Sequence, residues 1–334
     1  MDKIIRILAG LAIVQLVFVV IVNMGGNTLA GQAPNQPLLA FDKDQVDTLI
    51  IKGEKKTQVK LRKKEGQWQT EGGFPADQRK VESLVTKIHE MKHGLPVTNS
   101  DMAIKRFKVA NERFERHIIL QNGDRKLAAL FVGSGAGARQ SHVRSDDDIT
   151  VYTGSLGTYD APDTIGEWQD KNILQVDKKD ISSIKLEDRL FQRAKNKNEK
   201  NDTAQWESAN LPQGKHLNIK AINDGLSSLV DLTFNKVLGR ESKPEYGIDK
   251  PVLTLNLTYK KGEREYLFGK LKDKDDYVLK VSDWPEYFQL TGSVAKPILD
   301  SANSWLTDNV KKESKSDGKN ESTAGMVMDK SEAK

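Results

Sequence analysis

The feature that most constrains this 334-residue chain is a set of landmarks that recur in the same order at nearly constant spacing. Trp68 and Trp206 each end a strand-like segment, and the offset between them is almost the same as that between Trp168 and Trp305. Two further pairs keep nearly this offset: Gly123 with Gly262, and Tyr152 with Phe288. Several landmarks in one order at one offset predict a tandem duplication, with the copies at residues 44–175 and 176–310.

Each copy is expected to open with two strands and to continue with a helix after its first tryptophan. The strands are VDTLIIK and TQVKLRK in the first copy and ISSIKLE and RLFQRAK in the second. Apolar residues at helical spacing predict the helices: Val81, Leu84, Val85 and Ile88 in the first copy, and Ile219, Ile222, Leu226, Leu229 and Val230 in the second. Gly94 and Pro96 are expected to end the first helix.

A meander of strands is expected to follow each helix. Alternating residues predict one buried face, formed by Leu253, Leu255, Leu257 and Tyr259 in the second copy and by Phe114, Ile118 and Leu120 in the first. A short helix that carries Trp168 or Trp305 is expected to close each copy. The predicted fold class is therefore α+β with largely antiparallel sheets.

The N-terminal run IIRILAGLAIVQLVFVVIVN, residues 4–23, contains a single charge, Arg6. Residues 1–25 are therefore expected to form a cytoplasmic tip and one transmembrane helix. Lys3 and Arg6 precede the apolar stretch, and the next basic residue is Lys43. The positive-inside rule then places the N-terminus in the cytoplasm and the body in the periplasm, anchored in a bacterial inner membrane.

Two polar segments are expected to lack regular structure. Residues 26–43 contain Gly, Asn, Gln and Pro without periodicity and are expected to form a flexible stalk. Small residues at Thr28, Ala30 and Ala33 leave a cleaved signal peptide open as the alternative to a retained anchor. Residues 311–334 are polar and low in bulky apolar side chains, which predicts a disordered tail.

Charge and cysteine content exclude several classes of function. The 52 basic and 47 acidic residues are interleaved along the chain, whereas nucleic-acid binding requires a basic stripe with aromatic residues, so no nucleic-acid partner is expected. The chain has no cysteine. This excludes disulfides, thiolate catalysis, zinc–cysteine sites and a lipid-modified N-terminal cysteine.

The stretch KPEYGIDKPVLTLNLTY, residues 243–259, places an aromatic residue, a glycine and a proline just before a strand. In the first-copy counterpart, FKVANER, the aromatic and β-branched positions persist as Phe107 and Val109, but the glycine and proline do not. We therefore interpret the stretch as a structural joint and not as a binding site. In it the aromatic and β-branched residues enter the core, the glycine supplies an uncommon backbone angle, and the proline withholds a donor at the strand's first residue. The four residues concerned are Tyr246, Gly247, Ile248 and Pro251.

These motifs resemble a bacterial family catalogued as domain of unknown function 4340. The resemblance covers about residues 44–310 and is carried by GQWQTEGGFPADQRKVESLVTKI in the first copy and by EYGIDKPVLTLNL, LFGK and DDYVLKV in the second. The first copy lacks the glycine and proline, and the second lacks the P-A-D helix start. The resemblance implies a membrane-anchored extracytoplasmic protein, often associated with ABC-type exporters such as gliding-motility transporters. It implies no catalytic residues.

The stretch HEMKH is the strongest indication of an enzyme. On a helix, His89 and His93 would face one way and could bind zinc, with Glu90 as general base. Three features argue against it: the histidines lie to the solvent side of the apolar stripe, no third histidine follows at metzincin spacing, and the second copy has no equivalent. A distant glutamate or His117 remains open as a third ligand, with a charged solvated helix end as the other interpretation.

Three loops carry residues that can bind anions or cations. VGSGAGARQSHVR, residues 132–144, follows a strand, but no helix begins after its glycines, so we expect a flexible hairpin loop instead of a phosphate site. The acidic runs at residues 146–148 and 273–276 are compatible with weak cation binding, although solvated turns explain them equally.

The sequence therefore favours a non-catalytic periplasmic subunit that binds cargo or a partner. No cofactor is expected, and the family resemblance implies association with ABC permease and ATPase subunits. The alternatives are a zinc-dependent envelope hydrolase that uses His89, Glu90 and His93, and a structural envelope protein without a transporter.

Overall fold

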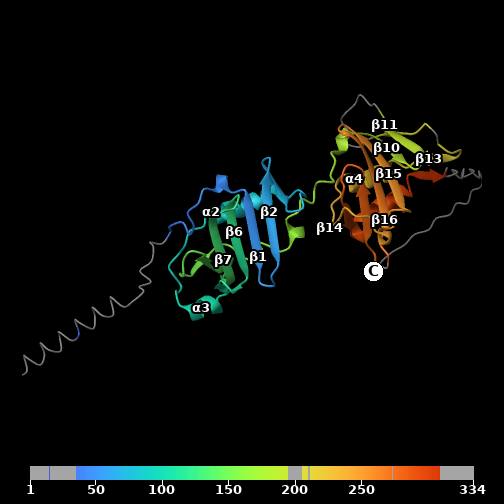
Figure 1. The fold of residues 1–334 in the computed structure, drawn as a ribbon. Coiled ribbons are helices and arrows are strands. Elements are labelled where there is room, and N and C mark those ends of the chain that lie inside the picture. The colour runs from blue at the N-terminus through green and yellow to red at the C-terminus, as the bar shows by residue number, and fades with distance from the viewer. Residues whose placement is uncertain (1–14, 16–34, 195–204, 210, 273, 309–334) are drawn as a thin grey trace, which may run out of the picture. The chain divides into compact units, whose positions relative to one another are not determined.

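The computed structural model describes residues 15, 35–194, 205–209, 211–272 and 274–308 (Figure 1). The expected membrane anchor (residues 1–25, except Gln15), the first half of the expected stalk (residues 26–34) and the expected disordered tail lie outside these residues. No helix within the described part of the chain is long and apolar enough to cross a membrane.

The described residues form two compact units. The first unit comprises the residues up to Gln175 together with Asp231–Glu241 and Glu286–Leu290. The second unit comprises Val176–Val230, Ser242–Pro285 and the residues from Thr291 onward. Both units combine antiparallel sheet with a few helices, so the predicted α+β class is confirmed.

The first unit contains a seven-stranded antiparallel sheet in the order β3-β2-β1-β6-β7-β8-β9 (Figure 1). Its strands are β1 (Thr48–Gly53), β2 (Gln58–Lys64), β3 (Gln67–Thr70), β6 (Arg116–Asn122), β7 (Arg125–Gly137), β8 (Gln140–Ser145) and β9 (Tyr152–Gly154). The remaining elements up to Gln175 are η1 (Lys43–Gln45), α2 (Gln78–His89), α3 (Asp101–Arg106), β4 (Val109–Ala110), β5 (Arg113–Phe114) and η2 (Ile165–Glu167). The strands expected at the start of the first copy are β1 and β2.

Helix α2 forms where the apolar periodicity predicts it. The Asp77 side chain caps its N-terminus by accepting a hydrogen bond of 3.1 Å from the Lys80 backbone N–H. Its buried residues are Val81, Leu84, Val85 and Ile88, the four predicted from the sequence. The helix ends at His89, however, five residues before Gly94, which was expected to end it.

The first unit also includes a strand pair from later in the chain. β14 (Lys236–Gly239) and β18 (Tyr287–Leu290) pair antiparallel. The Phe74 and Phe234 rings meet edge to face at a centroid distance of 5.8 Å, and the Phe234 and Phe288 rings are 5.0 Å apart. Lys171 adds a hydrogen bond of 3.0 Å from its Nζ to the Asn235 carbonyl. This aromatic cluster anchors residues 231–241 and 286–290 to the first unit.

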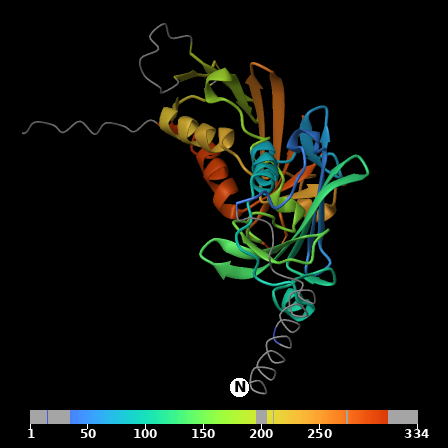
Figure 2. The same cartoon turned by 90° about the vertical axis from the view of Figure 1, so that its left-hand side faces the viewer.

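The second unit holds six of the eight strands of the second sheet, in the order β12-β11-β10-β15-β16-β17. These strands are β10 (Ile181–Leu186), β11 (Arg189–Arg193), β12 (Trp206–Glu207), β15 (Leu253–Tyr259), β16 (Gly262–Lys270) and β17 (Tyr277–Val281). The unit also contains η3 (Lys178–Asp180), β13 (Lys215–Leu217), α4 (Ile219–Val230), η4 (Pro244–Tyr246), α5 (Gly292–Ala302) and β19 (Leu306–Asp308). Figure 2 shows α4 (gold) and α5 (red) side by side.

The four landmark tryptophans are all buried. Trp68 lies in β3 and Trp206 in β12, as expected for strand ends. Trp168 and Trp305 are not within helices: Trp168 follows the short 3-10 helix η2, and Trp305 lies between α5 and β19. The prediction of a helix around each of them was wrong. The Trp168 indole N–H donates to the Pro162 carbonyl at 2.8 Å, and the Trp305 indole N–H donates to the Ser301 hydroxyl of α5 at 3.1 Å.

The joint has the same backbone form in both units. Gly247 has a φ of 65°, and Lys108, at the matching place after Phe107, has a φ of 56°. Tyr246 and Val109 are buried, but Ile248 is only half-buried, so it is not the core residue we expected. Pro251 lies two residues before the first residue of β15, not at the strand's first position as predicted.

Each joint rests on a glycine of the neighbouring strand. A Cβ atom on Gly133 in β7 would overlap the Phe107 carbonyl oxygen and lie 2.7 Å from the Lys108 carbonyl oxygen. A Cβ atom on Gly269 in β16 would overlap the Tyr246 carbonyl oxygen and lie 2.9 Å from the Gly247 carbonyl carbon. Residues 132–137, predicted as part of a loop, belong to strand β7, and the glycine at position 133 permits this close approach.

Two other expectations are corrected. Phe114 pairs with Val109 in the small β4–β5 hairpin and is not part of the meander strand that contains Ile118 and Leu120. Residues 35–38, expected to belong to a flexible stalk, are hydrogen-bonded to residues 91–93: the Leu38 N–H donates to the Met91 carbonyl at 2.8 Å.

We expect Gly133→Ala to lower the free energy of unfolding by about 1 to 3 kcal/mol, because the new methyl group would displace the Phe107 backbone. Gly135→Ala, two residues along the same strand, is the matched control, since its Cβ would meet only one atom, at 4.0 Å. Urea denaturation followed by tryptophan fluorescence measures both. Equal destabilisation by the two substitutions would contradict the importance of the close approach.

Candidate functional site

The HEMKH stretch does not form a helical metal site. Since α2 ends at His89 and Glu90 caps it, His93 lies beyond the helix. His93 is only 1% exposed, so the expectation that it faces solvent was wrong. Its ring lies 4.5 Å from that of Tyr152, and its Nδ1 is 2.9 Å from the Gly94 carbonyl oxygen. Among the described residues, no three or more His, Asp or Glu side chains are grouped to hold a metal ion.

The residues of the joints and the tryptophans serve mainly to pack the cores. Two of them come together at a cavity of about 350 Å³ in the second unit, where Pro251 and Trp305 are both part of the lining. Neither contributes a charged or titratable group to it.

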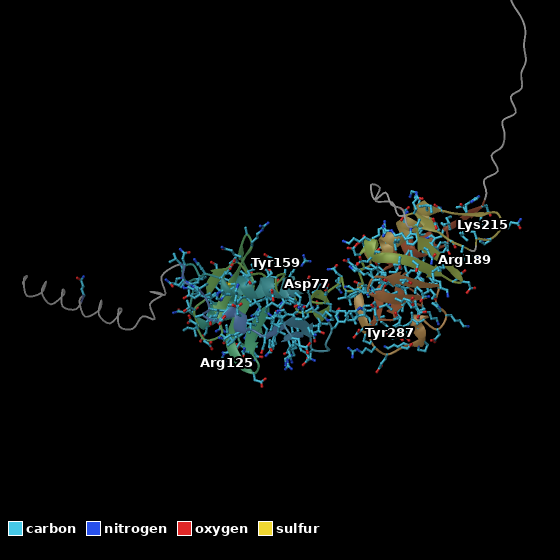
Figure 3. All side chains as sticks on the ribbon, turned by 90° about the horizontal axis from the view of Figure 1, so that it is seen from above. Asp77, Arg125, Tyr159, Arg189, Lys215 and Tyr287 are labelled. Atoms are coloured by element: carbon cyan, nitrogen blue, oxygen red, sulfur yellow. The ribbon has the colours of Figure 1, made fainter. Side chains whose placement is uncertain are left out.

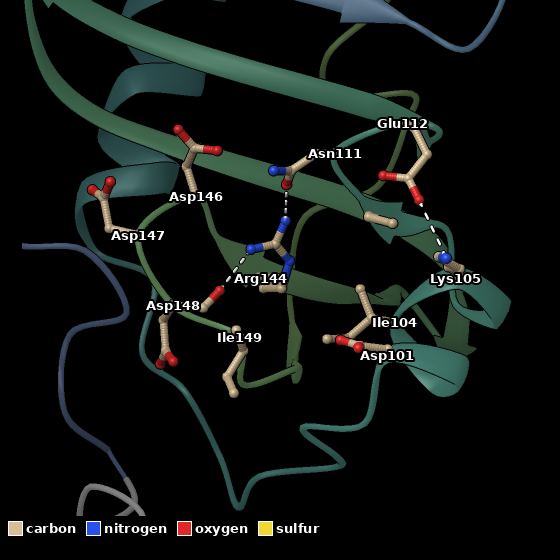
Figure 4. Close-up of a pocket in the computed structure, with 11 residues that line it drawn as sticks. Asp101, Ile104, Lys105, Asn111, Glu112, Arg144, Asp146, Asp147, Asp148 and Ile149 are labelled. Carbon is tan, nitrogen blue, oxygen red and sulfur yellow. Dashed lines mark hydrogen bonds and ion pairs between the residues drawn. The ribbon is translucent and has the colours of Figure 1, made fainter.

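The site with the richest chemistry is a pocket of about 430 Å³ in the first unit (Figure 4). Three segments form it: helix α3, the β4–β5 hairpin, and the loop that follows β8. Its lining residues are Asp101, Ile104, Lys105, Ala110, Asn111, Glu112, Arg144, Asp146, Asp147, Asp148 and Ile149. We call it the Arg144 pocket.

Arg144, at the end of β8, is 5% exposed and is held by neutral acceptors. Its Nε donates to the Val109 carbonyl at 2.7 Å and its Nη2 to the Asn111 side-chain oxygen at 2.7 Å. Its Nη1 donates to the carbonyls of Ser145 at 3.0 Å and Asp148 at 2.6 Å. A guanidinium has five N–H groups, and four of them donate to these acceptors. The fifth, on Nη2, has no acceptor among the described residues and is available to a ligand.

Below Arg144, an aromatic ladder crosses the sheet. His117, Phe131 and Arg144 are direct neighbours on β6, β7 and β8. The His117 ring stacks on Phe131 with centroids 4.0 Å apart, and the Arg144 guanidinium carbon lies 4.5 Å from the same ring centroid. Because β7 lies between β6 and β8, the imidazole and the guanidinium occupy opposite sides of Phe131. The ladder fixes Arg144 against the sheet.

Burial sets the protonation of both ends of the ladder. Burial lowers the pKa of His117 to about 4, although the nearby Asp146 carboxylate acts in the opposite direction. The His117 Nε2 lies 3.8 Å from Asp146 Oδ1 and has no hydrogen-bond partner in the part of the chain described. Burial also lowers the pKa of the Arg144 guanidinium, which nevertheless stays charged at neutral pH.

Five carboxylates surround the pocket, and two of them have no basic partner. Lys126 Nζ lies 3.0 Å from Asp146 and 2.8 Å from Asp147, and Lys105 Nζ lies 3.6 Å from Glu112. Asp148 accepts from the Thr150 N–H at 3.1 Å, and within the described ranges neither Asp148 nor Asp101 forms an ion pair. With Ile104, Ala110 and Ile149 as apolar lining, the pocket is suited to a positively charged group on an apolar stem.

Sequence reasoning noted the acidic run but missed Arg144. The arginine follows the buried Val143 directly, so strand alternation would place it on the opposite face, which gives no signal of burial. The pocket also depends on the β4–β5 hairpin, which is too short to produce a sequence pattern.

Comparison with known proteins supports the family indicated by the motifs. The family described as "Domain of unknown function (DUF4340)" matches residues 67–251, more than half of the chain. The chain therefore belongs to this family, as the resemblance predicted. Comparison with curated proteins and with solved structures finds no match.

We expect His117 to make the protein acid-sensitive. Because its pKa is about 4 when folded and about 6.5 when unfolded, the unfolded chain binds the proton first as pH falls below 6.5. Stability contributed by neutral His117 is complete above pH 6.5 and decreases by up to about 3 kcal/mol as the pH falls to about 4.

Urea denaturation of the wild type and of His117→Gln at several pH values measures this effect. The difference in unfolding free energy between the two should change between pH 6.5 and 4 and stay constant above pH 6.5. His216→Gln, an exposed histidine of the second unit, is the control. Parallel pH profiles for wild type and His117→Gln would contradict the prediction.

Proposed function

We propose that the protein is a single-pass inner-membrane protein with its α+β body in the periplasm, where it acts as a non-catalytic partner-binding subunit of an ABC-type export system. The apolar run at residues 4–23 and the basic residues before it support the anchor and its orientation. The expectation drawn from the family resemblance supports the link to a transporter.

We also propose that the body is a tandem duplication. The strand order β3-β2-β1-β6-β7-β8 in the first unit has the same form as β12-β11-β10-β15-β16-β17 in the second. Helix α2 follows β3, and helix α4 follows β12 with the short strand β13 between them. The joint recurs as well. The positive φ of Lys108 is matched by that of Gly247, and the glycine against which the joint packs is Gly133 in the first unit and Gly269 in the second.

The Arg144 pocket is the observation that carries the partner-binding function. It combines a fixed buried cation that retains one N–H donor with unpaired carboxylates and apolar side chains. A basic polypeptide segment complements all three, since its Lys or Arg side chains meet the carboxylates and a backbone carbonyl meets Arg144. An anionic ligand would face repulsion from Asp101 and Asp148. The favoured partner is therefore a basic segment of another subunit.

The test is purification of tagged full-length protein from its native membrane in mild detergent, followed by mass spectrometry. We expect stoichiometric ABC permease and ATPase subunits with the wild type. The double substitution Asp101→Lys with Asp147→Lys should weaken that association at least tenfold, which corresponds to about 1.4 kcal/mol. Both residues are exposed, so the fold should tolerate the change.

A matched control is Glu65→Lys with Glu71→Lys, which reverses two exposed charges of the first unit outside the pocket. Equal loss of the partner with both double variants would contradict a role for the pocket. Absence of transporter subunits from the wild-type preparation would favour the structural envelope protein. Stoichiometric zinc that is lost in His89→Ala would favour the hydrolase.

A further inference from the structure

A group of exposed apolar side chains lies beside the Arg144 pocket. Met102 on α3 is 84% exposed and Leu95, between α2 and α3, is 73% exposed. Ile149, in the loop after β8, is 52% exposed, and Val97 is 38% exposed. We call these four residues the Leu95–Ile149 face. The segments that carry them adjoin the Arg144 pocket, which is lined by Ile149 and by Asp101, the neighbour of Met102. Exposed large apolar side chains on adjoining segments mark a contact surface more often than isolated ones do.

The backbone beneath this face is ordered. The Val97 N–H donates to the Val151 carbonyl at 2.8 Å, and the Val151 N–H donates to the Thr98 carbonyl at 2.8 Å. This antiparallel bridge brings the segment with Leu95 and Val97 next to the segment with Ile149. Ser100 then caps α3 by accepting from the Ala103 N–H at 3.4 Å, which directs the chain into the helix that carries Met102. These hydrogen bonds hold the segments that carry the four exposed apolar side chains in place.

The face lies where the chain enters the first unit. The Asn35 N–H donates to the His93 carbonyl at 3.0 Å, and the His93 N–H donates to the Gln36 carbonyl at 3.1 Å. Leu95 comes two residues after this point. Only eleven residues separate Asn23, at the end of the apolar run, from Asn35. Whatever their conformation, they span at most about 40 Å.

We propose that the Leu95–Ile149 face contacts the surface of the membrane in which the protein is anchored, so that Leu95, Val97, Met102 and Ile149 enter the phospholipid interface. The proposal rests on the anchor of the proposed function. The short connection keeps this face within reach of the bilayer, and no other group of exposed large apolar residues in the described chain is tied to the entry point.

Apolar burial and not charge carries the contact. Lys92 and Arg106 are exposed beside the face, but Asp101 lies on the same helix and the acidic loop 146–148 lies next to Ile149. A near-neutral, apolar face is suited to the interfacial region of any phospholipid bilayer, without a requirement for anionic headgroups. The contact would also turn the Arg144 pocket towards the membrane surface, because Ile149 belongs to both.

The absence of native cysteine makes a direct test simple. Single cysteines replace Leu95 or Met102 in the full-length protein, are labelled with an environment-sensitive fluorophore, and are placed in nanodiscs with and without spin-labelled phosphatidylcholine. We expect at least a twofold drop in fluorescence with the quenching lipid, equal in pure phosphatidylcholine and in a mixture with phosphatidylglycerol. The control is a cysteine at Tyr159, exposed elsewhere on the first unit (Figure 3), which should not be quenched.

Separate outcomes identify which hypothesis fails. If alkaline carbonate releases the protein from native membranes, the anchor itself is wrong, and the proposed function fails with it. If the protein stays anchored but Leu95→Cys and Met102→Cys are not quenched, the membrane contact is wrong while the anchor stands. Labels that are unquenched in nanodiscs, at positions that are shielded from maleimide in native membranes, would assign the face to a protein partner and overturn the proposal.

Discussion

The contact between a backbone carbonyl and a glycine on the neighbouring strand is the constraint on which the first unit depends. The Phe107 carbonyl oxygen occupies the space of a side chain at Gly133, and the Ser134 N–H donates to it at 2.9 Å. This approach draws the end of α3 onto β7 and starts the β4–β5 hairpin directly afterwards. The same hairpin supplies Val109 and Asn111 as acceptors for Arg144. The close approach of the Phe107 carbonyl to Gly133 therefore helps to position the Arg144 guanidinium on the next strand, β8.

The energetics of the Arg144 pocket differ from those of a closed ion pair. A buried guanidinium bonded only to neutral acceptors keeps its positive charge uncompensated, so the surrounding carboxylates are attracted without being in contact. Their spare negative charge stays available to a ligand. A direct Arg–Asp ion pair would have neutralised the guanidinium and one carboxylate, and would have left less charge available for binding a ligand. The aromatic ladder makes this possible, since Phe131 supports the cation through its ring face.

The sequence predicted the elements that obey a period and missed those that depend on a single close contact. The stripes at Val81–Ile88 and in α4 predicted both long helices, because one face of each helix is buried. The glycines after Val132 were interpreted as a loop, because a strand glycine needed for close approach looks the same in sequence as a flexible one. His93 was expected at the surface, since nothing local reveals that α2 stops at His89. Arg144 gave no signal, because the tertiary arrangement of three short segments creates its pocket.

The aromatic cluster of Phe74, Phe234 and Phe288 has a consequence for the order in which the molecule can be completed. The first of these residues precedes α2, whereas the last follows most of the second unit in the chain. Because the chain is synthesised from its N-terminus, the first sheet is made long before β14 and β18, the strands that complete the first unit. During synthesis Phe74 therefore lacks first its Phe234 neighbour and then its Phe288 neighbour until these distant segments have been made, and a chaperone has this interval in which to act.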